Sequence, residues 1–174
     1  MLYKRSGQAM HLPPTCKCRP REWRHHIHNT WWYKASSFTY CVVGLITVLH
    51  SHRLVECAPA FPFRLLGVLV VANGITSYMG DVHTWGDQSN WKSVDILLAH
   101  TNVALQCLLI LMGLTGVASF PLSALGAHAV GVGIALLCKA LADQARDCHE
   151  YMRYHALWHI VLPVSALISG HVLV

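Results

Sequence analysis

The sequence predicts an all-α protein, a polytopic membrane helix bundle with about five transmembrane helices and its N-terminus inside. Two observations carry this prediction. Of the 174 residues, 54% are hydrophobic and only 12% are charged, a composition that is unusual for a soluble domain. The hydrophobic residues also gather in runs near the ~20 residues that a helix needs to cross the hydrocarbon core of a bilayer.

Five runs have this length, and short connections join them. The first run begins with Trp31 and Trp32, aromatic residues that suit the interface between membrane and water. The third run has no charged residue after Asp95. The expected helical membrane domain covers residues 31–174, with spans at 31–52, 63–80, 94–118, 121–142 and 152–173.

Residues 1–30 form a basic N-terminal arm, which we expect to be flexible because it cannot bury a core. A basic segment beside a membrane span favours the cytoplasmic side, and this places the N-terminus inside. The arm does not read as a secretory signal peptide, whereas an organellar transit peptide stays open. We expect an integral protein of an endomembrane or the plasma membrane, with an organelle as the alternative. Membrane lipid and other membrane proteins are the expected partners, and nucleic acid is not.

Threading five spans from an inner N-terminus brings polar residues from three helices into one leaflet. Ser77 and Asp81 fall at the inner end of the second span, and Asp95 falls at the inner start of the third. His155 and His159 lie in the first turns of the fifth span and share one helix face. Polar residues inside a membrane are expected to face one another. The spans therefore predict one buried polar cluster.

Two His four residues apart on a helix can bind one metal ion. The stretch reads His-Ala-Leu-Trp-His, without the Glu of the HExxH metalloproteases. A carboxylate at Asp81 would serve as the third ligand of a zinc site. Asp95 could then accept a proton from water held by the metal, and the Ser77 hydroxyl could donate to a developing oxyanion. The alternative is that these side chains only hold helices together.

These motifs together resemble the CREST superfamily of membrane hydrolases, which includes alkaline ceramidases, progestin and adipoQ receptors and myomaker-type proteins. The stretch YHALWHIVLP is most similar to the myomaker-type branch. The resemblance implies zinc ligands at His155 and His159, a catalytic or water-positioning role for Asp95 and polar support from Ser77. It also implies zinc-dependent hydrolysis of an amide or ester bond in a lipid. Members usually have seven spans and a His where this chain has Asp81.

Whether the chain is an enzyme therefore stays open at this point. The alternative is a non-enzymatic membrane protein, such as a scaffold, a fusion or remodelling factor, or an accessory subunit of a membrane complex. If a zinc site is present, His83 is an alternative candidate for one of its ligands. A haem-binding role is a third reading, with His50, His52, His128 and His171 as the histidines nearer the opposite face.

Overall fold

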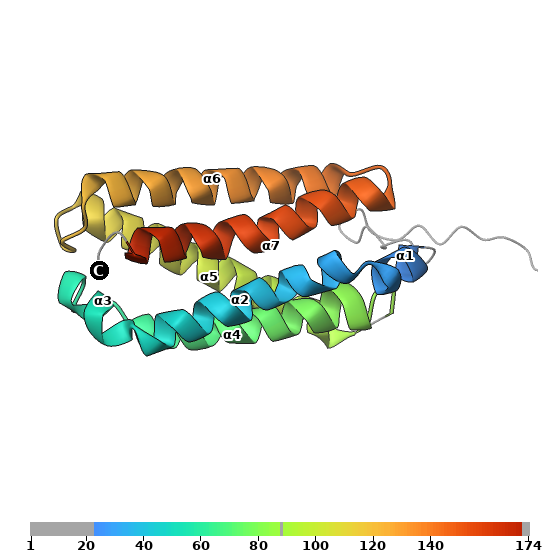
Figure 1. Cartoon of the computed structure of the whole chain (residues 1–174), viewed down its shortest axis with the longest axis horizontal. Coiled ribbons are helices and arrows are strands. Elements are labelled where there is room, and N and C mark those ends of the chain that lie inside the picture. Colours follow the sequence, from blue (N-terminus) through green and yellow to red (C-terminus); the bar gives the residue numbers. More distant parts are fainter. Residues whose placement is uncertain (1–22, 88, 172–174) are drawn as a thin grey trace, which may run out of the picture.

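The computed structural model describes residues 23–87 and 89–171, with side chains described through residue 167, and over this part of the chain it is all-helical (Figure 1). This confirms the predicted all-α class. The helices are α1 (Arg24–Asn29), α2 (Trp31–Leu49), α3 (Ser51–Cys57), α4 (Phe63–Tyr78), the π-helical turn η2 (Met79–His83), α5 (Asn90–Leu114), α6 (Leu122–Gln144) and α7 (Cys148–His171).

The bundle consists of two closely packed helix pairs, α2 with α4 and α6 with α7, and α2 also contacts α7 (Figure 1). Glycines allow α2 and α4 to approach so closely. A Cβ atom added to Gly44 would lie 2.6 Å from the carbonyl oxygen of Gly67, and one added to Gly74 would lie 2.6 Å from the sulfur of Cys41. Small residues at such crossings are typical of helix packing in membranes.

Helix α5 is polar toward the bundle and apolar toward the outside. Its buried residues are Asp95, Asn102 and Gln106, whereas Leu97 is 66% exposed and Leu114 is 65% exposed. A helix in water normally has the opposite arrangement. The outer face of α5 therefore suits hydrocarbon and not water.

Three helical segments of the described chain are long and apolar enough to cross a membrane: Phe63–His83, Asn90–Leu114 and Leu122–Gln144. Helices α2 and α3 together give a fourth candidate, although they meet at an angle of 71°. The architecture is thus compatible with an integral membrane protein. The count of about five spans and the inner N-terminus stay predictions.

The third expected span, residues 94–118, differs from the observed helix at both ends. Helix α5 begins at Asn90, because the Ser89 side chain accepts a hydrogen bond from the Trp91 backbone N–H at 3.1 Å and caps the helix. It ends at Leu114, shortly before Gly116, whose φ of +75° is a left-handed conformation that stops a helix.

The end of the basic arm folds onto the bundle. In α1, Ile27 is fully buried, and Trp23 just before it stacks on Trp85 with 6.4 Å between the ring centroids. Arg24 forms an exposed ion pair with Asp87 at 3.0 Å. The rest of the arm that we expect to be flexible lies outside the described residues.

Candidate metal centre

The site begins where α4 widens into the π-helical turn η2. The Thr84 backbone N–H donates to the carbonyl oxygen of Met79 at 2.9 Å, which closes the wider turn, and Asp81 within it is fully buried. One turn earlier, the Ser77 hydroxyl donates to Asp81 Oδ2 at 3.1 Å. Single π-helical turns are often found at functional sites.

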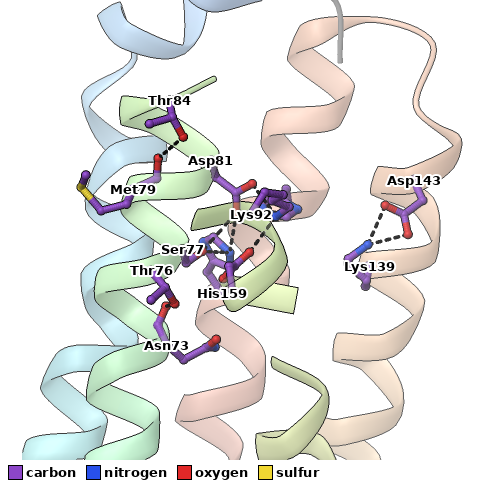
Figure 2. A network of polar contacts seen from close by, with 12 residues as sticks. Asn73, Thr76, Ser77, Met79, Asp81, Thr84, Lys92, Lys139, Asp143 and His159 are labelled. Carbon is purple, nitrogen blue, oxygen red and sulfur yellow. Dashed lines mark hydrogen bonds and ion pairs between the residues drawn. The ribbon is translucent and has the colours of Figure 1, made fainter. Parts of the chain in front are cut away.

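Helix α7 supplies two histidines to the same place. His155 and His159 are each 2% exposed, and their rings meet edge to face with 4.5 Å between the centroids. His155 Nε2 lies 2.9 Å from Asp81 Oδ2, and His159 Nε2 lies 3.9 Å from the same oxygen. His159 Nε2 also lies 3.0 Å from Ser77 Oγ (Figure 2). Four residues that the sequence analysis singled out, Ser77, Asp81, His155 and His159, therefore meet around the Asp81 carboxylate.

These distances fit a metal ion. One ligand atom each from Asp81, His155 and His159 lies within 4.8 Å of the other two. A tetrahedral zinc ion with bonds of ~2.0–2.2 Å requires ligand atoms ~3.3–3.5 Å apart. The observed separations of 2.9 and 3.9 Å fall on either side of that value. Two His and one carboxylate are also a donor set of catalytic zinc sites, which keep a fourth position open.

A serine from α2 is the partner of the second nitrogen of the His159 ring. The Ser36 hydroxyl donates to the carbonyl oxygen of Tyr33 at 2.7 Å, so its oxygen can accept from His159 Nδ1 at 3.2 Å. In a neutral ring with its hydrogen on Nδ1, the Nε2 lone pair faces the Ser77 oxygen, whose hydrogen is donated to Asp81, so that lone pair has a partner only when a metal ion or a second proton binds there. Metal-binding histidines usually have such a partner on the other ring nitrogen. Sequence reasoning missed Ser36.

A lysine bridges the two carboxylates. Lys92 Nζ lies 2.6 Å from Asp81 Oδ1 (Figure 2) and 2.7 Å from Asp95 Oδ2. The side chain of Lys92 is 27% exposed. Asp95 thus reaches the site through Lys92. Lys92 was missed because it precedes the expected span, although its spacing of three residues from Asp95 is the usual signal of a helical ion pair.

The group of Asp81, Lys92, Asp95, His155 and His159, which we call the charged cluster, has a charge imbalance. With both histidines neutral, two carboxylates and one ammonium leave one negative charge in a largely buried place. Buried charge is costly unless it is paired. A bound cation would remove the imbalance, and so would a proton on His155. The geometry supports both a metal site and a purely structural network.

The other histidines take no part in this site. His83, the substitute ligand, is exposed, although it lies in η2 beside Asp81. Among the described residues, the Asp81, His155 and His159 group is the one set of three or more His, Cys, Asp or Glu that could hold a metal ion. The haem reading, with His50, His52, His128 and His171, stays a prediction, and the side chain of His171 lies outside the described part.

The fold and the site define an all-helical bundle with a buried Asp-His-His group at one end. Comparisons with protein-family models, curated proteins and solved structures find no match to this chain. The resemblance to the CREST superfamily therefore stays a prediction.

Proposed function

We propose that this chain is a multi-pass membrane protein that binds one zinc ion through Asp81, His155 and His159 and hydrolyses an amide or ester bond of a membrane lipid. The observation that carries the proposal is the convergence of the three ligand atoms within 4.8 Å from two helices far apart in sequence. The CREST-like order of motifs supports the same reaction.

Each neighbouring residue would have a defined task. Zinc supplies a Lewis acid and lowers the pKa of a coordinated water toward neutrality. Lys92 holds Asp95 in place at 2.7 Å, and this carboxylate would take up a proton during the reaction. Ser77 donates a hydrogen bond that could stabilise a developing oxyanion. Ser36 holds the His159 ring in the tautomer that binds metal.

A lipid substrate follows from the surroundings of the site. The turn η2, the first turns of α5 and the first half of α7 hold the charged cluster, and apolar side chains such as Leu157 (40% exposed) and Ile160 (41% exposed) face outward beside it on α7. These side chains would hold a lipid next to the buried cluster, and the helices would have to part for its polar end to reach the metal ligands. With the N-terminus inside, the site would lie near the cytoplasmic face of an endomembrane or of the plasma membrane.

Zinc analysis of the purified protein tests the proposal. We expect about one zinc per chain in the parent and none in the double variant His155→Ala, His159→Ala. The matched control is the double variant His100→Ala, His149→Ala. Both of these histidines are exposed, and they lie on α5 and α7, two helices that also carry residues of the charged cluster. The control should keep its zinc. A parent protein without stoichiometric zinc, purified without chelator and offered Zn²⁺, rejects the site.

The second candidate is a non-enzymatic role in which the charged cluster only joins helices. It is favoured by the hydrogen bonds and ion pairs that Asp81 already makes to Ser77, Lys92 and His155. A scaffold, a remodelling factor or an accessory subunit of a membrane complex would use the cluster in this way. This candidate predicts that Asp95→Asn, which keeps shape but removes the base, leaves function intact.

A further inference from the structure

A second set of buried polar side chains lies deeper in the bundle. Asn73 on α4 and Asn102 and Gln106 on α5, which we call the carboxamide ladder, are between 0% and 3% exposed. Tyr40 on α2 is also 1% exposed, and its ring centroid is 5.5 Å from that of His159. Figure 2 shows Asn73 pointing into the bundle, farther from Asp81 than Ser77 is. The proposed reaction uses none of these four residues.

Each of these four side chains has at least one buried polar atom without a hydrogen-bond partner in the described part of the chain. The atoms are the Tyr40 hydroxyl, Asn73 Oδ1, both amide atoms of Asn102 and Gln106 Oε1. Buried polar groups in native proteins nearly always have a partner, which is either protein or ordered water. These atoms on three helices would therefore need water or another ligand as their partner.

Asn102 and Gln106 lie four residues apart on one face of α5, so their side chains are neighbours. Neither amide atom of Asn102 has a partner among the described residues, and neither does Gln106 Oε1. A water that makes two or more hydrogen bonds would satisfy both side chains at once.

The ladder ends at a small cavity. Gln106 lines a cavity of about 60 Å³ together with His128, Thr47 and apolar side chains such as Leu66. One water needs ~10–15 Å³ of such space, so the cavity is large enough for a few waters. Most of the lining side chains are apolar, and water would be held at the polar ones, Gln106, His128 and Thr47.

The chemistry of the ladder also favours water. Carboxamides and a phenol offer neutral donors and acceptors, and no charged side chain belongs to the ladder. An ion would need a charge or several converging oxygens, whereas water accepts and donates in turn and needs two to four polar partners. The partners would come from α2, α4 and α5.

We propose that Tyr40, Asn73, Asn102 and Gln106 bind a file of water molecules that runs inside the bundle from the charged cluster to the cavity beside Gln106. Asp81 and the two histidines are at most 2% exposed, so a hydrolytic centre there needs an internal supply of water and a path for protons. The role of the file in supplying water to the reaction rests on the proposed function. The presence of the water file does not depend on that function.

Water-edited solid-state NMR of the labelled full-length protein in lipid bilayers tests the file. Magnetisation passes from water protons to the side-chain amides, and we expect Asn102 and Gln106 to receive it as fast as the exposed Asn29 and Gln144. Transfer as slow as to the methyl groups of Leu162, which is fully buried among apolar residues, overturns the proposal.

Two variants give an independent measurement. Asn102→Leu keeps the approximate volume but removes both amide atoms, so we expect the melting temperature to fall by several degrees. Thr101→Val is the control, because the Thr101 hydroxyl bonds only its own helix, at the Leu97 carbonyl, among the interactions that the structure records. A melting temperature above that of the parent for Asn102→Leu contradicts the file, because it means that the amide was merely buried and unpartnered.

The same NMR measurement on the double variant His155→Ala, His159→Ala separates the two proposals. Fast transfer to Asn102 in this variant, with zinc absent from the parent, retains the file and rejects the zinc site. Slow transfer to Asn102 in a parent protein that holds one zinc per chain retains the zinc site and rejects the water file.

Discussion

The charged cluster and the carboxamide ladder are both buried and polar, but they differ in how their atoms are satisfied. In the cluster, Lys92 and His155 each take one oxygen of Asp81, at 2.6 and 2.9 Å. In the ladder, amide atoms such as those of Asn102 have no partner within the described residues. A charge in an apolar interior requires a fixed partner, whereas a neutral amide can form its hydrogen bonds with water. The cluster is therefore built to hold charge and the ladder to hold neutral ligands.

The largest effect that this comparison predicts is on catalysis. Asp95→Asn removes the base from the charged cluster but keeps the shape of the side chain and a hydrogen bond to Lys92. We expect hydrolysis to fall by about 10²–10⁴-fold, the usual contribution of a general base. The assay is the release of fatty acid from a mixed membrane-lipid extract, followed by mass spectrometry.

The zinc content of Asp95→Asn should stay that of the parent, because Asp95 is not among the three ligands. Unchanged function together with normal zinc content would favour the non-enzymatic role. A loss of zinc in Asp95→Asn would mean that Asp95 holds the site together and is not the base.

The next effect concerns stability. Lys92→Met leaves the Asp81 and Asp95 carboxylates buried without their shared cation, and we expect a loss of about 3–5 kcal/mol in the free energy of unfolding. Lys139→Met is the control, because the ion pair of Lys139 with Asp143 on α6 is exposed and such pairs contribute about 0.3–0.5 kcal/mol (Figure 2). Denaturant titration in detergent measures both.

Added zinc should restore much of the unfolding free energy that Lys92→Met loses. A cation bound at Asp81 replaces part of the missing positive charge, and a ligand at 100 times its Kd stabilises by about 2.7 kcal/mol. The stabilisation should disappear when His155→Ala is added. Equal losses of unfolding free energy in Lys92→Met and Lys139→Met would show that the buried carboxylates are neutral in the folded protein. The ion pairs of the charged cluster would then be rejected.

A smaller effect is expected from the partner of His159. Ser36→Ala removes the oxygen that lies 3.2 Å from His159 Nδ1, and the loss of such a partner typically weakens metal binding by about 10–100-fold. Ser37→Ala is a close control, because Ser37 is 1% exposed on the same helix and its hydroxyl has no hydrogen-bond partner among the described residues. Competition with a chromogenic chelator gives the Kd of each variant. Equal affinities in the two variants would remove Ser36 from the site.

The sequence could predict the helices from the length of the apolar runs, and threading these runs predicted that Ser77, Asp81 and the two histidines come together. It could not predict how residues of different helices pair. Ser36 looks like any small polar residue in a span, and only the packing of α2 against α7 brings it to His159. Lys92 stands just outside the expected span and looks like a solvated interfacial charge. The start of α5 at Asn90, set by the Ser89 cap, is what turns Lys92 into the bridge between two carboxylates.

The smallest effect is expected in the carboxamide ladder. Gln106→Leu replaces a neutral amide by an apolar side chain beside the cavity of about 60 Å³, and we expect a loss of about 1 kcal/mol, which is the net value of an ordinary hydrogen bond. This should be well below the loss in Lys92→Met, measured by the same titration. The difference follows from charge, because a water displaced by Leu leaves neutral neighbours whereas a removed ammonium leaves anions. A loss of unfolding free energy in Gln106→Leu as large as that in Lys92→Met would mean that Gln106 has a charged partner. The carboxamide ladder would then not be a set of neutral groups distinct from the charged cluster.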